Sequence, residues 1–172
     1  QCKEENRAAL IGYITAGFPT HEKSKEIAKA MIQGGVDVIE VGFPYSDPVM
    51  DGPVIQEASE IALANKTGAK EVLELVEAIS KTGVPTLVMS YWNPIEKYGV
   101  ENFATDLAKA GGAGTITPDL TIEEGSDWIA NSKKNNLDNV FVVAPSTTDD
   151  RLAKVSASTS GFLYAASLCL LY

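Results

Sequence analysis

Short, nearly continuous apolar runs alternate with longer amphipathic segments along the whole chain. Apolar runs rich in Val and Ile are typical of strands buried on both faces of a parallel sheet. Segments with apolar residues at helical spacing, bounded by capping residues and glycines, are typical of helices. The expected strands begin near residues 10, 36, 84, 113, 139 and 161. The expected helices are 21–34, 54–64, 69–82, one through Phe103 and Leu107, one that begins at the capping box Thr121–Glu124, and a short one opened by Thr147–Asp150.

This alternation predicts roughly six βα units with parallel crossovers, so we expect an α/β fold of the (β/α)8 or TIM-barrel type, with residues 1–172 in one domain. Two strand ends, Ile14–Pro19 and Ile39–Pro44, share one form, a trace of internal repetition. The alternative is a doubly wound open sheet, which should have a glycine-rich phosphate turn after its first strand. Gly17–Pro19 is not such a turn, and the glycines at 111–114 precede a strand instead of following one.

An acid, Glu40, lies near the end of the expected strand 36–41. A carboxylate there costs free energy unless something compensates it. A second acid, Asp51, follows in the proline-rich loop 42–53. Two acids in different environments at the end of one strand are what acid–base chemistry requires. From the residues alone, structural alternatives remain: Glu40 could be held by backbone N–H groups, and Asp51 could be a turn residue before Gly52-Pro53.

The composition excludes several classes of function. The net charge of −9 argues against nucleic acid or an anionic membrane as the main partner. Cys2 and Cys169 form no disulfide framework, and with His21 as the single histidine we expect no metal site. The sequence has no apolar stretch of membrane-spanning length and no visible signal peptide, so we expect a cytoplasmic enzyme.

One long segment resembles a known protein family. Residues 39–56 read Ile-Glu-Val-Gly-Phe-Pro-Tyr-Ser-Asp-Pro-Val-Met-Asp-Gly-Pro-Val-Ile-Gln, which closely resembles the signature of tryptophan synthase alpha subunits. Further stretches resemble that family in the same order over nearly the whole chain: Tyr13–Pro19, Met89–Pro94 with Tyr98-Gly99, Pro118–Leu120 with Glu123-Glu124, Ala144–Asp149 and Gly161–Ser167.

The resemblance implies a (β/α)8 barrel and a lyase of tryptophan biosynthesis. Members of the family cleave indole-3-glycerol phosphate to indole and glyceraldehyde 3-phosphate in a retro-aldol step. The indole passes to a beta subunit, which uses pyridoxal phosphate, whereas the alpha chain uses no cofactor. The expected assembly is an α2β2 tetramer.

The resemblance also implies roles for single residues. Glu40 matches the general acid/base, and Asp51 matches the acid that holds the indole N–H. Tyr164 matches a tyrosine whose hydroxyl supports the acid and the substrate, although it could be an ordinary core tyrosine. Tyr13 and Tyr91 match residues that face the indole pocket, although both could simply fill the barrel.

The loop after Glu40 has a second implied role in contacting the beta subunit. Pro44, Asp47 and Pro48 match that surface, together with Asn93, although the prolines could merely stiffen the loop. Outside these roles we expect Asp119 to be a loop acid, His21 a surface residue, and Trp92 and Trp128 packing residues.

The chain departs from the family after Ser167. The family continues there with a Gly-Val-Thr-Gly-type loop, whereas this chain reads Leu168–Tyr172, so we expect strands seven and eight of the barrel to be absent and the chain to be a fragment. Those strands would carry the phosphate site. Two alternatives to the lyase stay open: an inactive module that only binds the beta subunit, and a two-carboxylate glycosidase, whose retaining form needs its carboxyls about 5 Å apart.

Overall fold

The computed structural model describes residues 2–167, and Leu168–Tyr172, where the expected departure from the family falls, lies outside them. All strands pair in parallel, and a five-stranded sheet has the sequential order β1-β2-β3-β4-β5. A doubly wound sheet would reverse its strand order, so that alternative is wrong. The strands are β1 Ile11–Thr15, β2 Val38–Gly42, β3 Thr86–Met89, β4 Gly114–Ile116, β5 Asp138–Val140, β6 Val142–Val143 and β7 Tyr164–Ala165.

The parallel sheet continues beyond β5, because β6 follows β5 after a single residue, Phe141. This run pairs with β4 through its first part and with β7 through its second part. The strand expected to begin near residue 139 is therefore a broken strand over 138–143. Strands that pair in sequence order, each followed by a helix, form the wall of a (β/α) barrel, and the predicted fold class is confirmed.

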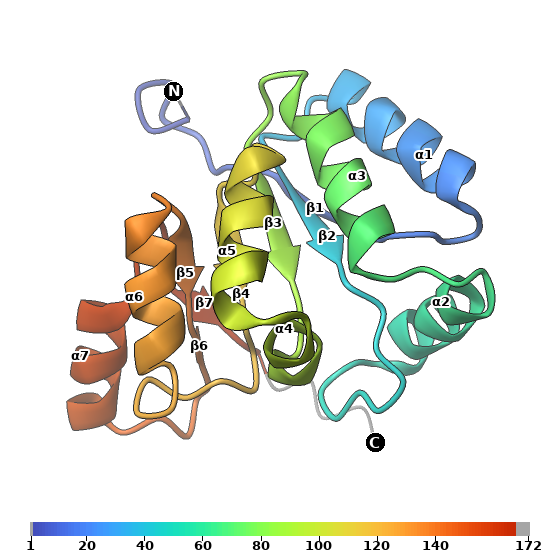
Figure 1. The fold of residues 1–172 in the computed structure, drawn as a ribbon. Coiled ribbons are helices and arrows are strands. Elements are labelled where there is room, and N and C mark those ends of the chain that lie inside the picture. The colour runs from blue at the N-terminus through green and yellow to red at the C-terminus, as the bar shows by residue number, and fades with distance from the viewer. Residues whose placement is uncertain (1, 168–172) are drawn as a thin grey trace.

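Helices cover one face of this curved wall, and Figure 1 shows α3, α5 and α6 in front of the strands, with α1 beside α3. Thr20 caps α1, since its hydroxyl accepts a hydrogen bond from Lys23 N at 3.2 Å. The helices are α1 His21–Gln33, α2 Pro53–Ala64, α3 Ala69–Ser80, α4 Trp92–Tyr98, α5 Val100–Lys109, α6 Ser126–Lys134 and α7 Asp149–Ser158.

Two helical expectations need correction. The Thr121–Glu124 box does form, with Glu124 N donating to Thr121 Oγ1 at 3.3 Å, but it closes a turn. The helix α6 begins only at Ser126, after the N-cap Gly125. The short helix α4 was not predicted, because Pro94 interrupts a segment that has too few residues to show a helical period.

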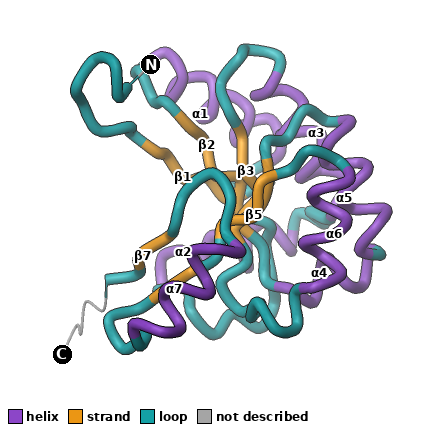
Figure 2. Tube along the Cα trace, turned by 90° about the vertical axis from the view of Figure 1, so that its left-hand side faces the viewer, coloured by secondary structure: helices purple, strands orange, loops and turns teal. Residues whose placement is uncertain are grey.

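Side chains alternate between two cores, as they must along strands. Ile39, Val41 and Val88 belong to the larger core beneath the helices. Leu87, Ile116 and Val140 form a smaller core on the opposite, concave face. In the view of Figure 2 the helices lie mainly to one side of the strands, and β7 extends toward the open side. Glu40 is in register with Tyr13 on β1 and with Leu87 on β3, so all three face the concave side.

The segment before β1 is tied to the start of β2 by one ion pair. The Arg7 guanidinium donates to both oxygens of Asp37, each at 2.7 Å, and Leu10 N donates to the same carboxylate at 2.8 Å. Arginine and carboxylate match geometrically in such a paired arrangement. None of the helices within residues 2–167 has the length and apolarity that crossing a membrane would require.

Candidate active site

Glu40 is a buried acid that the described part of the chain does not compensate. It is 7 % exposed, and burial raises the pKa of its carboxyl. Among residues 2–167 no hydrogen-bond donor or cation holds this carboxylate, which goes against the structural alternative of capping by backbone N–H groups. A carboxyl that burial destabilises as an anion, at the mouth of a barrel, is a candidate for proton transfer.

Tyr13 and Tyr164 lie near Glu40 on the concave face. Burial is the main cause that raises the pKa of Tyr164, and the negative charge of Glu40 adds to it. Burial also raises the pKa of Tyr13 to about 12, although a hydrogen bond from Thr15 opposes the shift and the charges of Asp51 and Glu40 add to it. Both carboxylates are therefore close enough to Tyr13 to act on its hydroxyl.

Asp51 lies in the loop between β2 and α2, and its side chain does not cap α2, whose N-cap is Gly52. Its backbone oxygen accepts from Gln56 Nε2 at 2.8 Å. Partial burial raises the pKa of the Asp51 carboxyl, while a hydrogen bond with Tyr91 lowers it. The Asp51 carboxyl therefore lies near the Tyr91 hydroxyl.

Tyr91 holds this loop from the end of β3. It is 5 % exposed, and its hydroxyl accepts a hydrogen bond from Met50 N at 2.9 Å. Its ring also lies against Tyr45, with 5.2 Å between the ring centres. Tyr91 therefore fixes the residue that precedes Asp51 in the chain.

Tyr13, Asp51 and Tyr91 line one small pocket at the carboxyl ends of the strands, which Glu40 and Tyr164 do not line. Its wall combines the apolar side chains of Phe43, Met89 and Pro118 with the polar side chains of Asp51 and Ser90 and the two tyrosines. The pocket is lined by Tyr13, Phe43, Asp51, Met89, Ser90, Tyr91 and Pro118.

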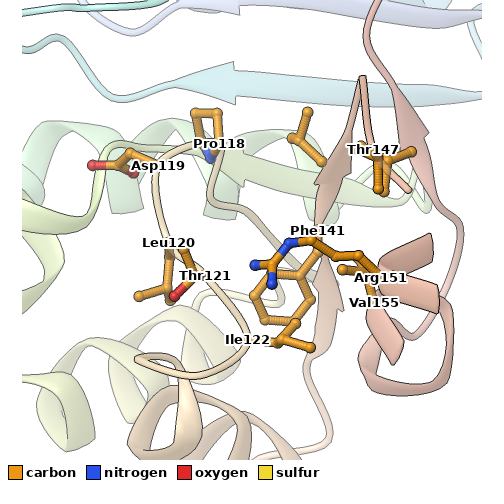
Figure 3. Close-up of a pocket in the computed structure, with 11 residues that line it drawn as sticks. Pro118, Asp119, Leu120, Thr121, Ile122, Phe141, Thr147, Arg151 and Val155 are labelled. Atoms are coloured by element: carbon orange, nitrogen blue, oxygen red, sulfur yellow. The ribbon is translucent and has the colours of Figure 1, made fainter. Parts of the chain in front are cut away.

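A second cavity lies between the β4–α6 loop and α7, and it contains none of the acids or tyrosines above (Figure 3). Arg151 reaches across it over Phe141 and pairs with Glu123, with both N–O distances at 3.0 Å. The Asp119 carboxylate lies at its border and points away from it in Figure 3. The candidate active site is therefore the pocket of Asp51, because Tyr13, which lines it, is in register with Glu40 on the neighbouring strand.

Comparisons with known proteins agree with this geometry. The family model described as tryptophan synthase alpha chain matches residues 1–169. The chain belongs to the tryptophan synthase alpha chain family. It is 60 % identical to the alpha chain of Thermobifida fusca over 168 residues, which is 98 % of this chain and 62 % of that protein. The alpha chain of Streptomyces coelicolor is 56 % identical over 167 residues, again 62 % of its length.

Solved structures of tryptophan synthase have the same fold. The chain matches the Mycobacterium tuberculosis tryptophan synthase with a TM-score of 0.95 and 51 % identity, over 96 % of this chain and 65 % of that one. It matches the alpha subunit from Legionella pneumophila with a TM-score of 0.93 and 37 % identity, over 98 % and 65 %. The chain thus spans about 62 % of the length of the curated relatives. Membership of this family goes against the glycosidase alternative.

The residues that the tryptophan synthase alpha resemblance assigns to a partner surface lie along one side of the site. Asp47 and Asn93 are exposed, Pro48 is half-buried and Pro44 is buried. Pro44 and Asn93 line one groove between the β2–α2 loop and α4, which Asp47 and Pro48 do not line. The structure therefore brings Pro44 and Asn93 together, and leaves Asp47 and Pro48 further along the loop.

The remaining residues that the sequence singled out have structural contacts. Trp92 and Trp128 pack edge to face with 6.1 Å between ring centres, and Trp128 Nε1 donates to Thr115 at 3.0 Å. These contacts confirm their expected packing role. His21 is half-buried, and its Nε2 lies 3.2 Å from the backbone oxygen of Asn65. Within residues 2–167 no group of three His, Cys, Asp or Glu side chains is placed to hold a metal ion.

Sequence reasoning missed three features of the site. It did not single out Phe43 or Met89 as pocket walls, although both lie in motifs that match the family. It also missed that Gly42 leaves the space for Tyr13, since a Cβ on Gly42 would overlap with the Tyr13 hydroxyl. The available signal was the glycine that ends β2, two positions after Glu40, which is in register with Tyr13.

Proposed function

We propose that this chain contributes the acid–base groups of a lyase that cleaves indole-3-glycerol phosphate to indole and glyceraldehyde 3-phosphate, in tryptophan biosynthesis. The observation that carries the proposal is Glu40, a buried carboxyl with a raised pKa at the barrel mouth of a tryptophan synthase alpha family member. Since the curated relatives are longer than this chain, the activity is proposed for the whole protein.

The reaction needs one proton added and one removed. The bond between indole C3 and the glycerol chain breaks when C3 takes up a proton, and the adjacent glycerol hydroxyl loses its proton as it becomes a carbonyl. In this proposal the protonated Glu40 carboxyl gives the first proton and the resulting carboxylate takes the second, so that Glu40 ends in its starting form. Burial raises the pKa of this carboxyl, which makes it a better proton donor for the first transfer while it stays able to accept the second proton.

The other polar groups act on charge and position. We propose that the Asp51 carboxylate accepts the indole N–H and stabilises the positive charge that forms on the ring when C3 is protonated. The Tyr164 hydroxyl supports Glu40 and the substrate. Tyr13 and Tyr91 flank the indole ring, for which the apolar walls of Phe43 and Met89 are suited.

We propose further that a beta subunit binds beside this site in an α2β2 tetramer, through Pro44, Asp47, Pro48 and Asn93. Large exposed apolar side chains on the same loop and at the start of α2 favour this, namely Val49, Met50 and Val54, which are 80 %, 55 % and 78 % exposed. In this proposal the alpha chain needs no cofactor, pyridoxal phosphate belongs to the beta subunit, and the protein is cytoplasmic and consists of one barrel domain.

The proposal is tested by indole release from indole-3-glycerol phosphate, with the beta subunit present and absent. Glu40→Gln keeps the shape of the side chain and removes its proton chemistry, so activity should fall by about a hundredfold or more. Glu60→Gln on the exposed side of α2 is the matched control and should keep full activity. If the wild type releases no indole but still binds the beta subunit, the alternative of a binding module is favoured.

A further inference from the structure

Asp119 contacts a part of the chain whose position matters for the pocket. It follows β4 and Pro118, and its two carboxylate oxygens lie 2.9 and 3.0 Å from Trp92 N, which donates to them. Trp92 is the first residue of α4, and the residue before it is the N-cap Tyr91. A carboxylate that accepts from the first N–H of a helix makes a charge-assisted hydrogen bond and interacts favourably with the helix dipole.

Tyr91 in turn contacts the loop that carries Asp51. Its hydroxyl accepts from Met50 N at 2.9 Å, although the two residues are 41 positions apart. The loop 43–52 is long, and Val49 and Met50 expose most of their side chains, so packing holds this part of the loop weakly. The hydrogen bond to Tyr91 therefore contributes much of what fixes the loop next to Asp51.

We infer that Asp119 is a positioning residue, which places Asp51 by fixing the backbone of Tyr91. Two hydrogen bonds link the three elements: one from Trp92 N to Asp119, and one from Met50 N to the Tyr91 hydroxyl. Trp92 follows Tyr91 in the chain and Met50 precedes Asp51, and both Tyr91 and Asp51 line the pocket. Each hydrogen bond therefore holds the backbone next to a pocket residue. Pro118, the neighbour of Asp119, lines the same pocket as Tyr91 and Asp51, so the linked segments form one continuous wall.

The direction of the Asp119 side chain agrees with this role. Its carboxylate points away from the cavity between the β4–α6 loop and α7 in Figure 3, and it is held by α4 instead. Asp119 does not line the pocket of Asp51. It therefore acts through Tyr91 and has no contact of its own with a bound ring.

Amide hydrogen exchange of Met50 tests the inference without any assay of activity. Asp119→Ala should lower the protection of the Met50 N–H by about tenfold, and Tyr91→Phe should lower it as much. Asp119→Asn keeps an oxygen that accepts from Trp92 N and should restore most of the protection. Asp127→Ala removes an exposed acid from the first turn of α6 and serves as the control, with no change at Met50. Unchanged Met50 protection in a folded Asp119→Ala variant would overturn the inference.

A second test rests on the proposed lyase function and measures the rate of indole release. Because Asp119 acts through Asp51, the double variant Asp119→Ala with Asp51→Asn should lose no more indole release than Asp51→Asn alone. Multiplied losses in the double variant would contradict a common route. If the wild type releases no indole at all, the proposed function fails, and the exchange measurement still decides the role of Asp119.

Discussion

The Tyr13 ring fills the space that a side chain on Gly42 would occupy, near the ends of β1 and β2. A Cβ on Gly42 would overlap with the hydroxyl, Cζ and Cε2 atoms of Tyr13, so the absence of a side chain at Gly42 lets the Tyr13 ring lie across the strand end. The same hydroxyl lies within the electrostatic reach of Asp51 and Glu40. A glycine thus decides where one polar group of the pocket lies.

Gly42→Ala should therefore displace the Tyr13 ring. We expect a loss of about 1–3 kcal/mol in the free energy of unfolding, because the ring or the strand must shift in a packed region. Denaturant unfolding measures this loss, and indole binding should weaken in parallel. Gly68→Ala is the control, since the nearest atom to its Cβ is Glu71 Oε2 at 3.6 Å, an ordinary contact. Equal effects of the two substitutions would contradict the role of Gly42.

Glu40→Gln should stabilise the fold at alkaline pH. Burial raises the pKa of Glu40 in the folded state above its unfolded value. The folded state therefore binds this proton more tightly, and its stability falls as the pH rises from the unfolded pKa through the raised folded pKa. Glutamine carries no such proton, so the variant should gain stability over the wild type above that window, and the gain should shrink toward pH 4.

Chemical unfolding at several pH values measures this difference for Glu40→Gln. Glu60→Gln, on an exposed side of α2, should give a difference from the wild type that stays constant with pH. A constant difference for Glu40→Gln as well would show that Glu40 has the same pKa in both states, and would remove the main support for proton transfer.

The Arg7–Asp37 pair should give the opposite dependence on pH. Hydrogen bonds from the Arg7 guanidinium and from Leu10 N hold the pKa of Asp37 well below its usual range. A depressed pKa contributes stability above the unfolded value, near 4, and this stability is lost as the pH falls through the folded pKa. Arg7→Ala should lower the free energy of unfolding at pH 7, and the deficit should diminish in strong acid.

The comparison with Arg151→Ala makes this measurement specific. Arg151 also pairs with a carboxylate on both nitrogens, but its partner Glu123 is 57 % exposed, whereas Asp37 is 15 % exposed. Exposed pairs contribute little to stability. A larger effect of Arg151→Ala than of Arg7→Ala would contradict the view that the N-terminal segment is held by Asp37.

Several site residues could be predicted from sequence because they belong to one short stretch. Glu40 and Asp51 lie on either side of a single loop, and the apolar run around Glu40 identifies its strand. The period of two along a strand also indicates that Val38 and Glu40 share a face. Helix α4 was missed because it is short. The late start of α6 was missed because Thr121–Glu124 forms a turn before the helix begins.

The sequence by itself determined the α/β barrel class, the family resemblance and the pair of acids at the end of β2, since each rests on residues close together in the chain. Only the tertiary structure decided that Glu40 is uncompensated within residues 2–167, that Gly42 makes room for Tyr13, and that Asp119 and Tyr91 hold the loop of Asp51. The physical reason is distance along the chain. Asp119 and Trp92 are 27 positions apart in the chain, and Tyr91 and Met50 are 41 apart. Strand register brings both pairs together at the carboxyl ends of β2, β3 and β4, and no local sequence pattern encodes that register.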